Sequence, residues 1–370
     1  MSKLEFSCNR SQILEAVSIC SRAVSVKSNI PALQGLLLES FNNQLRISSY
    51  DLEMGMKTQI EGTSDAEGSV VFPAKIFGDI LRRMTDDIVN ISVDEKNTAN
   101  IKCGEAESSV SCIDPDEFPE MPSVNKEKSL IIGSEIFKSM IRQTIFCVAQ
   151  NDSRPINTGI CFETEKNLLR LTALDGFRLA VRQENISCDE NIKFVVAGKA
   201  MNEILKLLND EGDVEISIGN RHILFIIDGY SIVTRLMDGE FMDFRKAVSN
   251  EFSTSVTIQT KKLLNSIELA SLIITEKIRT PIRCTFKDNI CDIKCQTSVG
   301  KVHDKVECNL SGNDVEIGVN NRYMIDALSA SDLDMVLIEM NGPLSPIKIK
   351  PLEGDSFLFI IMPMRIKDEL

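Results

Sequence analysis

The chain repeats one helical pattern three times, at intervals far longer than those of a solenoid. The segment FGDIL begins at Phe77, MNEIL begins at Met201 and MIDAL begins at Met324, so the copies lie 124 and 123 residues apart. Solenoid units span roughly 20–50 residues. This spacing therefore predicts repetition of a whole domain, although ordinary amphipathic periodicity also produces isolated matches of this kind.

Two further markers keep the same spacing. Helix-like segments begin at Ser11, Ser134 and Lys261, and residues 112–119 resemble residues 236–242. Because three separate markers agree in register, we expect three similar domains that tile the chain. The predicted domains are residues 1–124, 129–248 and 253–370.

Each predicted domain contains two helices, and each helix is followed by strands. Apolar residues recur at helical spacing, with Ser134 and Thr260 as candidate N-caps, in residues 11–23, 74–84, 135–148, 199–208, 261–274 and 321–330. Alternating or β-branched runs such as residues 89–93 predict strands. Asp175-Gly176 separates two such runs, which is a strong hairpin signal. The expected fold class is α+β, with each domain a duplicated helix-plus-strands unit.

Composition limits where such a protein works. Of the 370 residues 43% are hydrophobic, which is enough for three cores. No apolar run approaches the roughly 18 residues that span a bilayer, and the first residues lack the apolar segment of a signal peptide. The eleven cysteines form no paired framework, as is typical of reduced thiols. We expect a soluble protein that stays in the cytoplasm, with no membrane partner.

Residues for catalysis are scarce. His222 and His303 are the only histidines, and Gly198-Lys199-Ala200 lacks both the upstream glycine and the Ser or Thr of a phosphate-binding loop. Cys284, Cys291 and Cys295 lack metal-ligand spacing and fit a core better. We therefore expect no catalytic residue, no cofactor and no metal.

The C-terminal run FLFIIMPMRI, which begins at Phe357, resembles the ending of the bacterial sliding clamp, the DNA polymerase III β subunit. Segments IPAL from Ile30, DGFRLAV from Asp175, GEFMDFR from Gly239 and EKIR from Glu276 also stand where that family has them. The resemblance covers essentially the whole chain. It implies a non-catalytic processivity factor, which encircles duplex DNA, slides without sequence specificity and tethers the replicative DNA polymerase. It also implies a bacterial cytoplasmic protein that is associated with the nucleoid during replication.

The resemblance also implies a head-to-tail homodimer that forms a closed ring. Strands then pair across every domain junction and across the subunit boundary, so that no sheet edge is left exposed. Val110 would meet Leu272 and Ile273 of the other chain. The alternative is that these three residues belong to the internal core.

A ring of this kind needs a basic lumen, whereas the formal charge of the chain is −13. A negative net charge is compatible with a local concentration of positive charge in the lumen. Cations on the repeated helices and on the loops after them would attract DNA phosphates without reading the bases. Pro155 and Ile156 replace the aromatic residues that the family has in the middle loop, so base stacking is in doubt there. The alternative for each cation is an ordinary solvated side chain. The candidates are Arg22, Lys27, Arg82, Arg83, Lys138, Arg142, Asn151, Arg154, Lys199, Lys206, Lys261, Lys262, Lys277, Arg279 and Arg322.

The resemblance places a peptide pocket between the second and third domains, for short motifs of polymerases, an ATP-dependent clamp loader and other repair or replication proteins. Methionines suit such a site because they repack around different peptides. Met242 and Asn157 depart from the family pattern, so the preferred motif is open, and the Met-Pro-Met run also fits an ordinary edge strand. The implied pocket residues are Leu174, Gly176, Phe177, Arg178, Leu179, Met242, Ala247, Ile278, Tyr323, Leu344, Pro346, Ile360, Met362, Pro363, Met364, Arg365 and Ile366.

Two other classes of function stay open at this point. One is an enzyme of triplicated ancestry, for instance a hydrolase that uses Asp175 and Arg178. The other is an interaction scaffold with the same fold and no DNA in its hole. Retention on circular but not on linear DNA separates a clamp from both.

Overall fold

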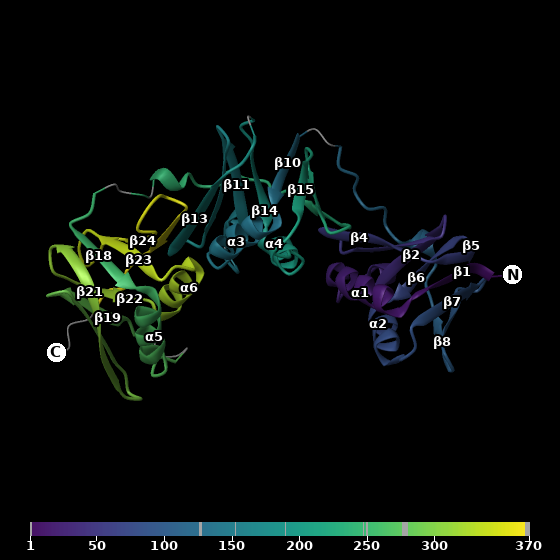
Figure 1. Cartoon of the computed structure of the whole chain (residues 1–370), viewed down its shortest axis with the longest axis horizontal. Coiled ribbons are helices and arrows are strands. Elements are labelled where there is room, and N and C mark those ends of the chain that lie inside the picture. Colours follow the sequence, from purple (N-terminus) through teal and green to yellow (C-terminus); the bar gives the residue numbers. More distant parts are fainter. Residues whose placement is uncertain are drawn as a thin grey trace. The chain divides into compact units, whose positions relative to one another are not determined.

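The computed structural model describes residues 2–125, 128–151, 153–188, 190–246, 248, 251–275 and 280–366. Two compact units make up the chain, Met1–Ser134 with Lys206–Leu236, and Glu135–Leu205 with Met237–Leu370. Figure 1 shows the helices and strands of both units.

The first unit begins with a complete repeat. Its elements are β1 (Ser2–Asn9), α1 (Arg10–Cys20), η1 (Ser21–Ala23), η2 (Pro31–Gln34), β2 (Gly35–Phe41), β3 (Gln44–Tyr50), β4 (Met54–Glu61), β5 (Thr63–Ala66), β6 (Gly68–Pro73), α2 (Ala74–Arg83), β7 (Ile88–Asp94), β8 (Thr98–Cys103), β9 (Ala106–Ser111) and η3 (Pro115–Glu117). Five strands form a sheet in the order β5-β1-β7-β8-β9, which leaves β9 at one edge. Helices α1 and α2 lie side by side, and α1 packs against β4 (Figure 1).

The same unit contains half of the second repeat. Its strands are β10 (Lys128–Gly133), β15 (Asp213–Ile218), β16 (His222–Ile227) and β17 (Tyr230–Arg235). They join the first repeat in an eight-stranded sheet of order β10-β15-β16-β17-β4-β3-β2-β6. The junction is the antiparallel pair β17 and β4, in which Val233 stands opposite Gly55.

The second unit holds the rest of the second repeat and all of the third. Its elements are α3 (Ser134–Ile145), η4 (Pro155–Thr158), β11 (Gly159–Glu165), β12 (Leu168–Leu174), β13 (Arg178–Asn185), β14 (Lys193–Ala197), α4 (Gly198–Leu205), η5 (Phe244–Lys246), β18 (Thr254–Gln259), α5 (Thr260–Ser271), β19 (Ile282–Lys287), β20 (Ile290–Gln296), β21 (Lys301–Gly312), β22 (Val315–Val319), α6 (Asn321–Ser331), β23 (Met335–Met340), β24 (Ile347–Lys350) and β25 (Phe357–Ile361). Twelve strands follow the order β14-β11-β12-β13-β25-β24-β23-β18-β21-β20-β19-β22. Pairing of β13 with β25 joins the two repeats, and α5 and α6 lie side by side.

The repeated pattern marks equivalent core positions. Phe77 on α2, Met201 on α4 and Met324 on α6 are all buried. In α2 the Phe77 ring packs on Phe72, with ring centroids 4.4 Å apart. Each helix thus buries the same position of its repeat, as one apolar stripe on a sheet-covering helix requires.

The predicted N-caps at Ser134 and Thr260 are wrong, because each is the first residue inside its helix. Gln259 caps α5 without a side-chain hydrogen bond, and Thr260 is the first helical residue. Its hydroxyl oxygen is buried and has no hydrogen-bond partner among the described residues. In α6 a side chain does cap the helix, because the side-chain Oδ1 of Asn320 accepts a hydrogen bond from the Tyr323 backbone N–H at 3.2 Å.

All eleven cysteines are free thiols, and nine of them are buried. Burial raises the pKa of Cys8 to about 12. Burial also raises the pKa of Cys20 to about 12, although a hydrogen bond with the Thr58 backbone acts in the opposite direction. Such thiols stay protonated at neutral pH and behave as small apolar core residues. Among the described residues, no three His, Cys, Asp or Glu side chains are grouped to hold a metal. No helix in the same part of the chain is both long and apolar enough to cross a membrane.

Candidate peptide pocket and nucleic-acid interface

The turn between β12 and β13 presents an aromatic side chain to solvent. The Asp175 carboxylate accepts hydrogen bonds from the backbone N–H groups of Phe177 and Arg178, at 2.9 and 3.0 Å. Gly176 has φ +87°, a conformation that favours glycine. These constraints hold the turn while Phe177 stays 62% exposed.

The end of the chain is attached to this hairpin. Strand β25 pairs with β13, with Ile360 opposite Leu179. Beyond the strand, the Met362 backbone N–H donates to the Phe177 carbonyl oxygen at 2.8 Å. Residues from the second and third repeats therefore meet along one ladder.

A cavity of about 240 Å³ opens beside this ladder, and we call it the peptide pocket. Buried Leu174, Leu179 and Ile360 form its floor, whereas Met242 and Met362 are 41% and 42% exposed. A cluster of exposed apolar side chains on a soluble fold marks an interaction surface. The full lining is Arg154, Leu174, Gly176, Phe177, Arg178, Leu179, Met242, Pro346, Ile360 and Met362.

Arg178 is fixed behind the pocket by two carboxylates and a ring. Its Nε lies 2.9 Å from Asp175 Oδ2, its Nη1 lies 2.5 Å from Asp326 Oδ2, and its guanidinium carbon lies 4.4 Å from the centre of the Tyr323 ring. Burial lowers the pKa of Arg178, but the hydrogen bonds to Asp326 and Asp175 outweigh burial, so the pKa is raised. Arg178 therefore stays charged, its charge is balanced by Asp175 and Asp326, and it holds the turn in place.

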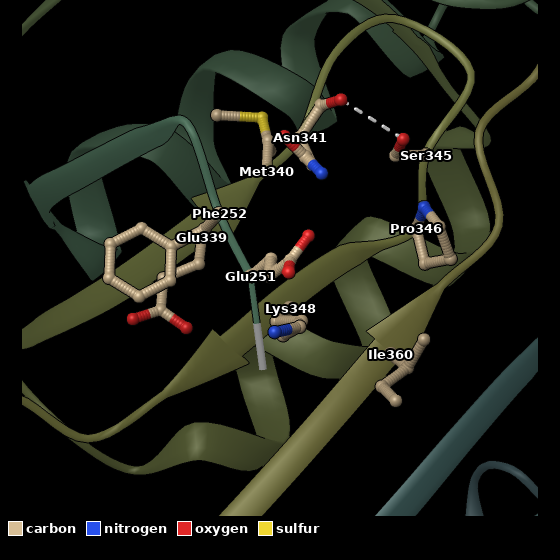
Figure 2. Close-up of a pocket in the computed structure, with 9 residues that line it drawn as sticks. All are labelled: Glu251, Phe252, Glu339, Met340, Asn341, Ser345, Pro346, Lys348 and Ile360. Atoms are coloured by element: carbon tan, nitrogen blue, oxygen red, sulfur yellow. Dashed lines mark hydrogen bonds between the residues drawn. The ribbon is translucent and has the colours of Figure 1, made fainter. Parts of the chain in front are cut away.

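Figure 2 shows the lining of a second cavity, of about 140 Å³. This cavity shares Pro346 and Ile360 with the peptide pocket. Here Glu339 is buried and pairs with Lys350 at 2.7 Å. Figure 2 also shows Ser345, whose hydroxyl donates to the Asn341 carbonyl oxygen at 3.1 Å. The apolar pocket therefore continues into a more polar recess. Its lining is Glu251, Phe252, Glu339, Met340, Asn341, Ser345, Pro346, Lys348 and Ile360.

The structure gathers many, but not all, of the implied pocket residues. Tyr323 lines an adjoining cleft instead, and Leu344 is exposed outside the lining. Pro363 is half-buried and also outside it. Met364, Arg365 and Ile366 line a different cavity, beside Lys301 and His303, because the Met364 N–H donates to the Gly318 carbonyl oxygen on β22 at 2.8 Å. Ala247 and Ile278 lie outside the described residues.

Sequence reasoning missed two contributors to this region. Arg154 lines the peptide pocket, although its loop position suggested a DNA-facing role. Asp326 holds Arg178, and its only signal was its place inside the repeated segment on α6. Asn157, the departure from the family pattern, is buried and directly follows Ile156, which belongs to the same apolar cluster as the floor residues Leu174, Leu179 and Ile360.

Three of the DNA-facing candidates surround one cleft of about 1220 Å³. They are Asn151 after α3, Lys199 on α4 and Arg322 on α6, and all three are exposed. Phe177 and Arg178 line the same cleft. The cleft therefore brings polar and cationic side chains from three segments to the back of the peptide pocket.

The other candidates lie on helix ends and loops. Arg82 and Arg83 are exposed in the last turn of α2, where cations favour the helix dipole. Asp79 partly neutralises Arg82, and Asp332 partly neutralises Arg142, each at 2.5 Å. Lys27, Lys206, Lys261 and Lys262 are exposed, and Lys138 and Arg22 are half-buried. Lys277 and Arg279 lie outside the described residues.

The candidate dimer residues occupy one surface in each unit. In the first unit Val110 lies on the edge strand β9 and is buried. In the second unit Leu272 caps the C-terminus of α5 and is 77% exposed, with Ile273 half-buried beside it.

Models of three protein domains match the chain in order. The N-terminal, central and C-terminal domains of the DNA polymerase III beta subunit match residues 4–122, 131–243 and 245–365. The chain belongs to the DNA polymerase III beta subunit family. The beta sliding clamp of Staphylococcus aureus is 28% identical and covers 98% of this chain and 99% of its own length.

Solved structures of the family agree with this fold. A DNA polymerase III beta subunit from Eubacterium rectale has 32% identity and a TM-score of 0.94, covering 98% of this chain and 99% of its own. The sliding clamp of Bacillus subtilis has 26% identity and a TM-score of 0.96, covering 99% and 100%.

Membership of the DNA polymerase III beta subunit family confirms the predicted function. The chain is a sliding clamp, a non-catalytic processivity factor that binds DNA and the polymerase and forms dimers. The fold class of three similar α+β domains is also confirmed, and the head-to-tail ring follows from the same identity. The enzyme that would have used Asp175 and Arg178 is thereby set aside.

Proposed function

We propose that two copies of this chain close the ring by pairing β9 of each copy with the outer edge of β21 of the other. The observation that carries this proposal is a junction that occurs twice within the chain. The last strand of the second repeat, β17, pairs with β4 of the first, and the last strand of the third, β25, pairs with β13 of the second. Strands β4, β13 and β21 hold the same place in their repeats, as do β9, β17 and β25.

At both internal junctions, the last strand of one repeat pairs with the strand equivalent to β4 in the repeat before it. The two strands without such a partner within the chain are β9 and β21. Strand β9 ends its sheet, and residues 301–307 of β21 pair with β20 on one side only. Among the described residues, no strand pairs with either outer edge. An exposed strand edge is a template for pairing with another strand. In a head-to-tail dimer, each of the two junctions covers one β9 edge and one β21 edge, so all four edges are paired. Val110 would then pack on Leu272 and Ile273 of the other copy.

We propose that the cations named on the helices and loops face DNA in the lumen. Most of the described candidates are exposed, and Asn151, Lys199 and Arg322 surround one cleft; both observations support this role. The pairing of Arg142 with Asp332 reduces its share of the charge. Dispersed cations of this kind hold the phosphate backbone without fixing a register, so the ring slides.

We propose that the peptide pocket takes short apolar motifs from the replicative polymerase, from a separate ATP-dependent clamp loader and from other repair or replication proteins. The apolar floor and the exposed Phe177, Met242 and Met362 support this role. Aromatic and methionine side chains are frequent energetic centres of such interfaces.

We also propose a cytoplasmic location, which the buried free thiols favour. The domain bounds 1–124, 129–248 and 253–370 stay a prediction.

The test of the proposed function is topological. The protein is loaded on a nicked circular plasmid with a bacterial clamp loader and ATP, and half of each sample is then cut once with a restriction enzyme. Gel filtration should recover the protein with the circles and not with the cut DNA. Equal recovery from both would mean that affinity, rather than encirclement, holds the protein.

A further inference from the structure

We infer that the edges that close the ring carry opposite charges in register, so that Glu107 of one copy stands opposite His303 of the other. This inference rests on the proposed pairing of β9 with β21. It adds which residues face each other across the junction, and it explains why the two copies pair head to tail.

The first hairpin of each repeat fixes the equivalent positions on one edge. The innermost pairs of these hairpins are Tyr50–Gly55, Leu174–Leu179 and Gln296–Lys301. Gly55, Leu179 and Lys301 therefore occupy the same position in their repeats.

The last hairpin does the same for the other edge. Its innermost pairs in the first two repeats are Cys103–Ala106 and Ile227–Tyr230, so Ser109 is equivalent to Val233. Following the ladders β18-β23-β24-β25 and β10-β15-β16-β17 places Ile360 at the position of Val233 as well.

The two junctions within the chain share one register. Val233 stands opposite Gly55, and Ile360 stands opposite Leu179. Applied to the free edges, this register sets Ser109 opposite Lys301. Because the strands are antiparallel, it also sets Glu107 opposite His303.

The alternation of exposed and buried residues supports this register independently. Glu107 on β9 is exposed and Val110 is buried, while Lys301 and His303 on β21 are exposed and Val302 is half-buried. The transferred register places exposed residues opposite exposed ones, whereas a slip of one residue would reverse the faces. It also sets Val110 opposite Gly300, where a side chain would lie 3.9 Å from Ile273 Cγ2.

The β21 edge is basic. Arg283 and Lys294 stand directly opposite each other across β19 and β20, a pair of like charges that is unfavourable by itself, and His303 on β21 stands opposite Lys294. Asp292 accepts from Lys294 at 2.8 Å and lies 2.7 Å from His303 Nε2, and Glu316 lies 3.4 Å from Arg283. Lys301 and Lys305 flank His303 on the same exposed face and add two further charges.

The β9 edge is acidic. Glu107 stands opposite Lys102 on β8, and its Oε1 accepts from Asn100 Nδ2 at 2.5 Å. Glu105 lies two residues earlier, in the turn that precedes β9, at the end of the edge nearest Lys305 in this register. In this register Glu107 adds a carboxylate from the other copy opposite His303, between Lys301 and Lys305. Pairing of β9 with β9, or of β21 with β21, would place like charges together, so the charges select head-to-tail assembly.

Charge reversal on each edge tests the inference. Glu107→Lys and His303→Glu are each expected to weaken the homodimer about tenfold, because both junctions of the ring carry the altered pair. Mixing the two variants should restore dimers, since one junction then joins the introduced lysine to the introduced glutamate and the other junction is unaltered. Sedimentation equilibrium at low salt measures the dissociation constants, and high salt should shrink all the differences.

A cross-linking pair tests the register without depending on charge. The double variant Glu107→Cys with His303→Cys should form a covalent dimer under mild oxidation, because facing strand positions meet disulfide geometry. The matched control is Ser108→Cys with His303→Cys, whose side chains point to opposite faces. Wild type under the same oxidant reports on the native thiols.

Each outcome decides a different claim. If the wild type is a dimer but the mixture gains nothing over the separate variants, or if the control pair cross-links as well as the test pair, the charged register is overturned while ring closure stands. If the wild type stays monomeric throughout, the proposed ring closure fails, and the register fails with it.

Discussion

Asp326 Oδ2 on α6 lies 2.5 Å from Arg178 Nη1 and ties this helix of the third repeat to the β12–β13 hairpin of the second. The Arg178 side chain is 12% exposed and also bonds Asp175, which shapes the turn that presents Phe177. The position of the pocket rim therefore depends on a carboxylate that does not line the pocket.

Asp326→Asn should loosen this tie. We expect a loss of about 1–2 kcal/mol in the free energy of unfolding, because a mostly buried guanidinium loses a charged partner. Affinity for a polymerase-derived peptide should fall several-fold, as measured by fluorescence anisotropy. Asp332→Asn is the matched control, since its partner Arg142 is exposed and such pairs contribute little. Equal effects of both variants would contradict the positioning role of Asp326.

The exposed rim of the peptide pocket should dominate peptide binding. Phe177→Ala and Met362→Ala are each expected to weaken the same peptide about tenfold, because both truncate apolar surface that a peptide covers. The dimer should be unaffected in sedimentation. Leu352→Ala removes an equally exposed apolar side chain outside the pocket and should change nothing.

Met364→Ala separates the pocket from the run of residues that follows it. Its side chain lines a different cavity, and its backbone is held by Gly318. We expect peptide affinity close to that of the wild type in the anisotropy assay. A loss as large as that of Met362→Ala would show that the pocket extends to Met364 when a peptide is bound.

The cleft cations should contribute to DNA binding without regard to sequence. Lys199→Glu with Arg322→Glu is expected to weaken binding to any duplex and to lower the slope of log affinity against log salt by about one for each lost phosphate contact. Lys287→Glu, on an exposed hairpin and paired with Asp314, is the control. An unchanged salt slope in the double variant would remove these two residues from the DNA interface.

His222 should titrate below the ordinary histidine range. Burial, together with the charges of Arg235 and Arg221, lowers its pKa from 6.5. The folded protein disfavours the charged ring, so His222 does not lower the free energy of unfolding above pH 6.5. As the pH falls below that value, the free energy of unfolding decreases. Since the chain has only two histidines, proton NMR resolves each ring. His222→Gln should reduce the loss of unfolding free energy in acid, and titration above 6.5 would contradict the assignment.

Much of the fold could be predicted from local sequence patterns. The six helices lie where the periodicity places them, because an amphipathic stripe is written in neighbouring residues such as Phe77 and Leu81. The hairpin at Asp175-Gly176 was equally local. Pairing of β17 with β4 joins residues such as Val233 and Gly55, and no local signal encodes that contact.

The pocket shows the same division between local and distant information. Its hairpin and C-terminal strand followed from a resemblance in sequence, whereas the direction of the chain after Met362 depends on the bond from Met364 to Gly318. Arg154 and Asp326 were missed as parts of this region for the same reason. Both reach it through contacts with residues distant in sequence.

The sheets that continue from one repeat into the next have a mechanical consequence. If β17 separates from β4, or β25 from β13, the polypeptide still tethers the two strands, and they rejoin at high effective concentration. In the proposed ring, no backbone tethers β9 of one copy to β21 of the other. Such a ring parts first at one of these two joints while the other acts as its hinge, so an opening machine has only one short ladder of hydrogen bonds to break.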